Sequence, residues 1–125
     1  MEIGKSRPRP LEGKRILLAE DNRDVGDYLR SELERAGGTV AGPAGSLSHC
    51  HELLDAEEFD GAVLDIFLTD GLATGLVDRL RLETIPFIFV TGFPEHPLPE
   101  KVASVPLLAK PGDYKSLIPV AARTF

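Results

Sequence analysis

A short run of apolar residues at 62–68 (AVLDIFL) constrains the fold of this chain more than any other stretch of its sequence. A continuous apolar run of this length is typical of a strand that is buried on both faces of a parallel sheet. Asp65 is the only charged residue in the run. A charge there is costly unless it is paired, bound to a metal or placed at the open end of the strand. Because ligands bind at that end of an open α/β sheet, the sequence predicts a site around Asp65.

Similar apolar runs recur along the chain and alternate with segments of helical periodicity. The strands are predicted at 14–19, 39–41, 62–68, 86–90 and 105–109. Short apolar strands that alternate with amphipathic helices favour a parallel sheet with helices on both faces. We therefore predict one α/β domain with a doubly wound, five-stranded parallel sheet, since right-handed crossovers leave few other topologies.

Capping residues mark where the predicted helices begin. Asn22, Ser46 and Asp113 precede apolar periodic segments, and their side-chain oxygens can accept hydrogen bonds from the first free amides of a helix. Pro119 falls inside the last predicted helix. It should kink or shorten that helix, because proline has no backbone N–H and clashes with the preceding turn.

Turn and breaker residues divide the remaining segments. Gly42-Pro43 is predicted to end the second strand, and Thr69-Asp70-Gly71 has the composition of a turn. A helix is then predicted at 72–83 from its apolar stripe. The stretch 93–100 contains three prolines, so we expect a short or irregular helix there.

Composition and charge limit the classes of function. The chain has 125 residues and a net charge of −6, which suits one domain and argues against nucleic acid as a direct partner. No apolar run approaches the roughly 18 residues of a membrane span. The single cysteine, Cys50, excludes an internal disulfide and fits a reducing compartment, so we predict a cytoplasmic protein. Residues 1–12 are predicted to form a flexible N-terminal tail, and residues 13–125 the domain.

Polar residues that follow four of the strands should meet at one edge of the sheet. They are Glu20, Asp21, Asp65, Thr91 and Lys110. Three adjacent carboxylates repel one another and require a hard cation, and oxygen ligands of this kind suit Mg²⁺ or Mn²⁺. With a lysine and a hydroxyl beside the metal, such a site would accept a phosphoryl group on a nucleophilic carboxylate.

Four short motifs carry a resemblance to a known family. The sequence reads I-L-L-A-E-D at 16–21, V-L-D-I at 63–66, F-V-T-G at 89–92 and L-A-K-P at 108–111. Each motif alone is weak, but the four together, in order and each at a strand end, resemble a response-regulator receiver domain over residues 13 to 124. The resemblance implies a flavodoxin-like (βα)5 fold with strand order 2-1-3-4-5.

The resemblance also implies roles for the site residues. Asp65 would receive phosphate from a histidine kinase or a histidine phosphotransfer protein. Asp21, Asp65 and the backbone carbonyl of Phe67 would bind Mg²⁺, and Glu20 would contribute through water. Thr91 and Lys110 would bind the phosphoryl oxygens.

The function implied is that of a single-domain response regulator in a two-component phosphorelay. It would either switch protein–protein interactions with an unknown downstream protein or act as a phosphate sink for its kinase. It would assist its own Mg²⁺-dependent phosphorylation and dephosphorylation without being an enzyme in the usual sense. Neither a membrane nor a nucleic acid is an expected direct partner.

Two departures from the family pattern concern the last two strands. The stretch 105–109 (VPLLA) has no aromatic residue, which puts the family's aromatic switch in doubt, and Gly112 stands where the family usually has phenylalanine. The run 89–93 (FVTGF) resembles a receiver subclass with Phe-Ala-Thr-Gly followed by Gly or Tyr. That subclass is often stand-alone and pairs with HWE-type or related histidine kinases. We expect phosphorylation to order residues 93–103 instead of rotating an aromatic ring.

Other functions fit the same residues less well. An aspartyl-phosphate phosphohydrolase would need a second aspartate where Phe67 stands, and no phosphate-binding G-x-x-x-x-G-K follows the first strand. The main alternative is a pseudo-receiver, an interaction module that works without phosphorylation. Asp70 is predicted to be a turn residue, and His96, in the proline-rich stretch, is the histidine closest to the expected site.

Overall fold

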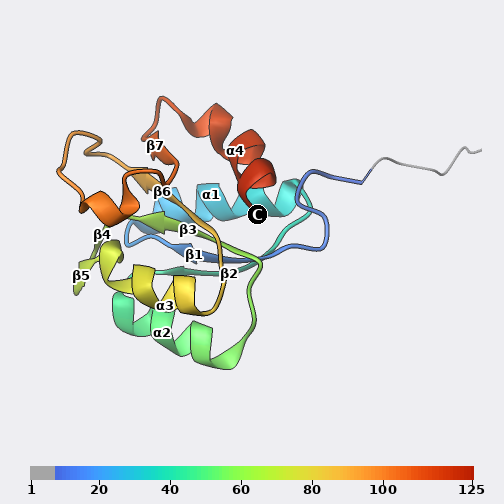
Figure 1. Ribbon diagram of the computed structural model, residues 1–125. Coiled ribbons are helices and arrows are strands. Elements are labelled where there is room, and N and C mark those ends of the chain that lie inside the picture. Colours follow the sequence, from blue (N-terminus) through green and yellow to red (C-terminus); the bar gives the residue numbers. More distant parts are fainter. Residues whose placement is uncertain (1–7) are drawn as a thin grey trace, which may run out of the picture.

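The structure is a computed structural model in which residues 8–125 are described, and they contain a five-stranded parallel sheet (Figure 1). The strand order is β2-β1-β3-β6-β7, which confirms the predicted order 2-1-3-4-5. The strands are β1 (Arg15–Ala19), β2 (Thr39–Ala44), β3 (Gly61–Asp65), β6 (Phe87–Thr91) and β7 (Leu107–Ala109). β1 and β3 are central, and nearly all of their residues are buried, as continuous apolar runs predict.

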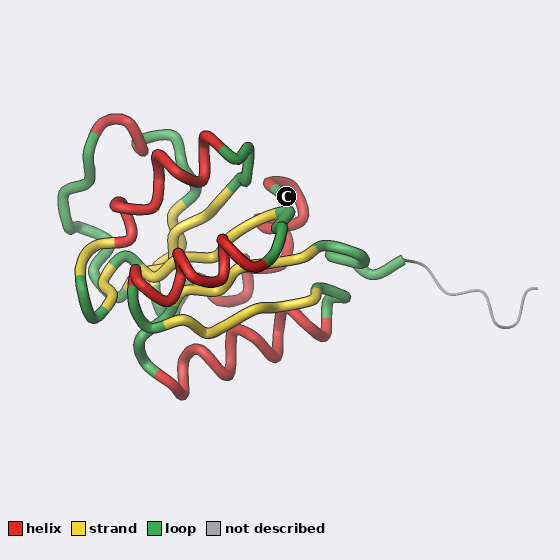
Figure 2. Tube along the Cα trace, turned by 90° about the horizontal axis from the view of Figure 1, so that it is seen from below, coloured by secondary structure: helices red, strands yellow, loops and turns green. Residues whose placement is uncertain are grey.

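Two helices cover each face of the sheet. α1 (Arg23–Arg35) and α4 (Leu117–Thr124) pack on one face, and α2 (Leu47–Ala56) and α3 (Val77–Leu82) pack on the other (Figure 1). In Figure 2 the strands run side by side with the helices along them. This doubly wound arrangement leaves the carboxyl ends of the strands free at one edge of the sheet.

The first two helices begin at the predicted caps. The side chain of Asn22 accepts a hydrogen bond from the Val25 amide at 3.1 Å. The Ser46 hydroxyl accepts one from the His49 amide at 3.0 Å. Each cap satisfies an amide that has no partner inside its helix.

Strand limits differ most from the sequence prediction in β2 and β3. β2 continues to Ala44 instead of ending at Ala41, because Gly42 adopts a positive φ of 110° and the pairing with β1 resumes opposite Ala19 after a register shift. β3 ends at Asp65, whereas a strand was predicted over 62–68.

The residues after Asp65 form a separate hairpin. β4 (Phe67–Leu68) pairs antiparallel with β5 (Gly71–Leu72), so the turn predicted at 69–71 is the turn of this hairpin. Apolar periodicity could not separate β3 from β4, because both are apolar and extended.

Two of the helices begin with a 3-10 turn that the sequence did not predict. The helix predicted at 72–83 is a 3-10 turn, η1 (Ala73–Leu76), followed by α3. At the C-terminal end, η3 (Tyr114–Ser116) precedes α4. Asp113 does not cap this helix, because its carboxylate accepts a hydrogen bond from the Ala109 amide at 2.8 Å. Pro119 lies in the first turn of α4, where a missing N–H leaves no helical bond unmade.

The connection between β6 and β7 is mostly irregular. Its only helical turn is η2 (Glu100–Val102), as the prolines of this stretch predicted. Val102 is the one residue in the segment 93–103 that is buried.

Part of the predicted N-terminal tail packs on the domain. Leu11 is fully buried, and its amide donates a hydrogen bond to the Ala36 carbonyl at 2.8 Å. Leu11 therefore belongs to the packed domain, although the predicted boundary was at residue 13. Residues 1–7 of the predicted tail lie outside the described part of the chain. Among the helices of residues 8–125, none is both long and apolar enough to cross a membrane.

Candidate functional site

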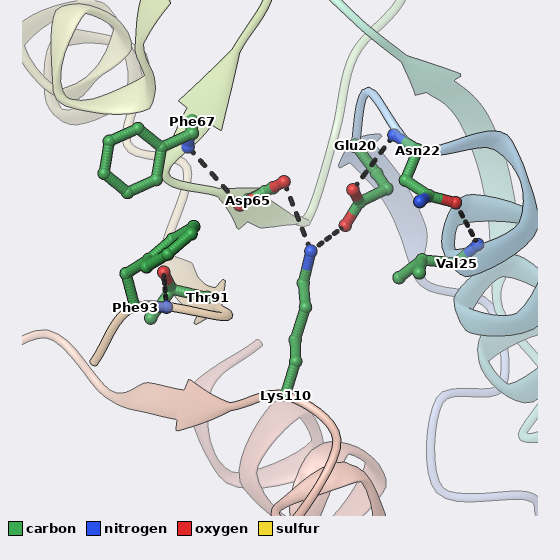
Figure 3. Close-up of polar contacts among 8 residues, drawn as sticks. All are labelled: Glu20, Asn22, Val25, Asp65, Phe67, Thr91, Phe93 and Lys110. Atoms are coloured by element: carbon green, nitrogen blue, oxygen red, sulfur yellow. Dashed lines mark hydrogen bonds and ion pairs between the residues drawn. The ribbon is translucent and has the colours of Figure 1, made fainter.

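Four neighbouring strands bring the predicted site residues to one edge of the sheet. Glu20 follows β1, Asp65 ends β3, Thr91 ends β6 and Lys110 follows β7. Figure 3 shows the Lys110 side chain reaching from the β7 side toward Asp65 and Glu20. The parallel sheet thus gathers residues that are far apart in the sequence, as the strand pattern predicted.

Three carboxylates form a compact cluster at this edge. Oxygen atoms of Glu20, Asp21 and Asp65 all lie within 4.8 Å of one another. Glu20 is 3% exposed and Asp65 is 6% exposed, whereas Asp21 faces solvent. A set of oxygen donors that is buried on one side and open to water on the other suits Mg²⁺, which keeps several of its waters. The residues therefore fit the cation that the sequence predicted.

Lys110 places a positive charge beside the buried carboxylates of the cluster. Its Nζ lies 2.5 Å from Glu20 Oε1 and 3.2 Å from Asp65 Oδ2. Burial alone would lower the pKa of Lys110, but the hydrogen bond to Glu20 and the charge of Asp65 raise it overall. Lys110 is therefore cationic and bridges the two buried carboxylates.

Glu20 has an unusual environment for a carboxylate. Burial raises the pKa of Glu20 to about 7, and the neighbouring Asp65 charge acts in the same direction, against the hydrogen bond from Lys110. The other carboxylate oxygen of Glu20, Oε2, accepts a hydrogen bond from the backbone N–H of Asn22 at 3.1 Å. Glu20 is thus held in place by the residue that also caps α1, an effect that capping patterns alone did not predict.

Backbone amides orient the other two side chains. Asp65 Oδ1 accepts a hydrogen bond from the Phe67 amide at 3.3 Å. The Thr91 hydroxyl, on a fully buried residue, accepts one from the Phe93 amide at 3.0 Å. Both amides belong to the residue two positions further along the chain, so each strand end folds back on its own polar side chain.

An aromatic cluster beside the carboxylates was not predicted from the sequence. The Phe67 ring contacts the rings of Phe93 and His96, with centroid distances of 5.3 and 4.9 Å. Together with Glu95 these residues line an open hollow of about 630 Å³, and Phe93 is 65% exposed. The cluster joins the β4–β5 hairpin to the irregular segment 93–103. Its residues follow no periodic pattern, so only the contacts reveal it.

Comparison with known proteins identifies the fold. No protein-family model matches the sequence, and no curated protein matches it. Solved structures do resemble the chain. The non-phosphorylated HemR receiver domain from Leptospira biflexa has a TM-score of 0.73 and 27% identity, over 88% of this chain and 92% of that one. This chain has the response-regulator receiver fold. The response regulator PhyR from Brucella abortus has a TM-score of 0.75 and 26% identity, over 89% of this chain and 47% of that one.

One structure of similar fold was solved with Mg²⁺-BeF bound. TrrA from Thermotoga maritima, solved in complex with Mg²⁺-BeF, has a TM-score of 0.75 and 17% identity, over 88% of this chain and 97% of that one. The matched region thus spans nearly all of the HemR receiver-domain chain and the TrrA chain, and about half of the PhyR chain. The subclass suggested by residues 89–93 stays a prediction.

Proposed function

We propose that this receiver domain is a single-domain response regulator that accepts a phosphoryl group on Asp65. The observation that carries the proposal is the position of Lys110, whose ammonium contacts both Asp65 and Glu20 at the open edge of the sheet. A buried aspartate between a lysine and further carboxylates can become an acyl phosphate once a cation is present to neutralise the added charge.

The metal would be Mg²⁺ or Mn²⁺. Asp21, Asp65 and the backbone carbonyl of Phe67 would hold it, and Glu20 would contribute through a water molecule. The cation would neutralise charge on the phosphoryl oxygens. The carboxylate cluster and the Mg²⁺-BeF complex of the structurally similar TrrA support this proposal.

The reaction needs a nucleophile, a donor and a leaving group. A carboxylate oxygen of Asp65 attacks the phosphorus of a phosphohistidine, the P–O bond forms, the P–N bond breaks, and the neutral histidine of the donor leaves after taking up a proton. Lys110 Nζ moves from the Asp65 carboxylate to a phosphoryl oxygen, and the Thr91 hydroxyl donates to another. In dephosphorylation, water attacks the phosphorus, the P–O bond to Asp65 breaks and inorganic phosphate leaves, which restores the Asp65 carboxylate.

The partners follow from this chemistry. The donor would be a histidine kinase, of the HWE type if residues 89–93 mark that subclass, or a histidine phosphotransfer protein. We propose a cytoplasmic location, where such donors present their histidines. Phosphorylation adds about −1.5 to −2 charge at Asp65, which biases the surrounding surface toward or away from a downstream protein. A phosphate sink would need no such protein, so acquisition of a partner on phosphorylation separates the two roles.

The proposal is tested by intact mass spectrometry after incubation with Mg²⁺ and acetyl phosphate, beside the variant Asp65→Asn. We expect a labile phosphate adduct on the wild-type protein only, and its loss when Mg²⁺ is chelated. An adduct that persists in Asp65→Asn would contradict the assignment of Asp65. If the wild-type protein neither forms an adduct nor binds Mg²⁺, the pseudo-receiver reading is favoured instead.

A further inference from the structure

The β4–β5 hairpin docks on the beginning of α2 through Asp70. Asp70 Oδ1 accepts a hydrogen bond from the Leu47 amide at 2.5 Å, and Asp70 Oδ2 accepts one from the Ser48 amide at 3.1 Å. These amides lie in the first turn of α2 and have no partner within the helix. Asp70 therefore caps a helix that is distant in sequence, in addition to turning its own hairpin.

Thr69 strengthens the same contact. Its amide and its hydroxyl both donate to the Gly45 carbonyl, at 3.0 and 3.1 Å. The Leu47 side chain packs closely against Gly71 of the hairpin. A Cβ atom added to Gly71 would lie only 2.9 Å from Leu47 Cδ1. The turn of the hairpin is thus fixed to the segment that precedes and begins α2 by four hydrogen bonds and a close apolar contact.

The other end of the hairpin holds the phosphoacceptor. Phe67 pairs with Leu72 in the hairpin, and its amide donates to Asp65 Oδ1 at 3.3 Å. That distance is beyond the usual range for an N–H···O bond, so a small displacement of the hairpin would break it. The Ala73 amide also donates to the Ile66 carbonyl at 2.7 Å, which closes the loop that the hairpin makes.

We propose that Asp70 is a positioning residue for the phosphoacceptor site. By tying the turn of the hairpin to α2, it fixes the backbone of Phe67, and Phe67 in turn orients the Asp65 carboxylate. The inference rests on the proposed function, in which Asp65 and the Phe67 carbonyl hold Mg²⁺. It differs from helix capping alone, because a cap would stabilise α2 without affecting the carboxylate cluster.

The test compares Asp70→Ala with the matched variant Ser46→Ala. Each removes one side-chain cap from the first turn of α2, but the Ser46 hydroxyl bonds only its own helix, at His49. We expect Asp70→Ala to raise the Kd for Mg²⁺, measured by calorimetry, by about tenfold. This is the low end of the loss in metal affinity that is typical when a residue that orients a metal ligand is removed. Ser46→Ala should lower the Tm and leave that Kd unchanged. Asp70→Asn, which keeps one acceptor oxygen, should give an intermediate Kd.

A second measurement separates this inference from the proposed function. If the wild-type protein does not bind Mg²⁺, the proposed function fails, and the positioning role is then measured without metal from the amide resonances of Phe67 and Asp65. We expect Asp70→Ala to shift the Phe67 amide resonance and to speed its hydrogen exchange, while Ser46→Ala does neither. Equal effects of the two variants on the Phe67 amide, or none, would overturn the inference. Asp70→Asn provides the same comparison if Asp70→Ala does not fold.

Discussion

The two halves of the sheet are built differently, although both contribute to the site. β2, β1 and β3 have five or six residues each, and α1 and α2, which join them, have 13 and 10. On the other side, β7 has three residues, and its connection from β6 contains only the three-residue η2. The carboxylates come from the regular half, whereas Thr91 and Lys110 come from the half with the irregular connection.

The cause of the difference is local. Pro94, Pro97 and Pro99 lack the backbone N–H that a helix would need, so the connection cannot form the long helix that covers the other strands. Its anchors are few: the buried Val102, the partly buried Leu98, the rings at Phe93 and His96, and an ion pair between Lys101 and Asp78 at 3.2 Å. We infer that the regular half supplies the carboxylates of the site, and that the irregular connection is the part free to respond to their chemistry.

The largest expected effect comes from the core of the regular half. Leu64 on β3 is fully buried, so Leu64→Ala should lower the free energy of unfolding by about 4 kcal/mol, through lost apolar burial and the cavity that remains. Urea denaturation measures the change. The control is Leu82→Ala on α3, where the side chain is 85% exposed and we expect almost no effect. Equal losses for the two variants would contradict the account of the core.

Lys110 joins the two halves, and its removal should have the next largest effect. Lys110→Ala leaves the buried Glu20 and Asp65 carboxylates without their cation, at a cost of about 3 kcal/mol, since the Lys110 side chain is only 14% exposed. Added Mg²⁺ should restore part of the loss. The exposed pair is the control, and Lys101→Ala should cost less than about 1 kcal/mol. A Lys110→Ala protein as stable as Lys101→Ala in urea would break the proposed link.

The irregular connection should be sensitive to the loss of its buried anchor, but less so. Val102 is 2% exposed, and Val102→Ala removes two methyl groups from the apolar core, which should cost about 1.5 kcal/mol. In Val102→Ala we expect hydrogen exchange to be faster in residues 93–103 and nearly unchanged in β3, because this segment can open by itself. Uniform acceleration across the whole sheet would show that the two halves open together.

The smallest expected effect is the loss of the stabilising contribution of Asp70 at acid pH. The hydrogen bonds from the Leu47 and Ser48 amides hold the pKa of Asp70 below its usual value, with the first the stronger cause. A carboxylate with a lowered pKa stabilises the fold at neutral pH, and this contribution is lost as the pH falls through its folded pKa. The Tm of Asp70→Asn should therefore lie below that of the wild-type protein at neutral pH, and the two should converge in acid. A Tm difference that does not change with pH would contradict the capping role.

Sequence patterns predicted the arrangement of the strands and the edge of the sheet at which the site forms. Strand order, the caps at Asn22 and Ser46, and the edge where Glu20, Asp65 and Lys110 meet all follow from apolar runs and their polar ends. These are local signals, repeated along the chain.

The features that were missed depend on contacts between distant segments. The turn composition around Asp70 does not indicate its bonds to α2, because these depend on the hairpin and the helix lying side by side. Asp113 was expected to cap a helix and instead bonds the Ala109 amide. The aromatic cluster around Phe67 likewise has no periodic signature.

The most direct test of this account is hydrogen exchange measured segment by segment, before and after phosphorylation with acetyl phosphate and Mg²⁺. We expect exchange in residues 93–103 to slow on phosphorylation, because Thr91 and the adjacent Phe93 amide reorganise around the phosphoryl group. β1 and β3 should stay equally protected in both states. Unchanged exchange in residues 93–103 of a fully phosphorylated protein would contradict the claim that the irregular connection responds to the chemistry of the regular half.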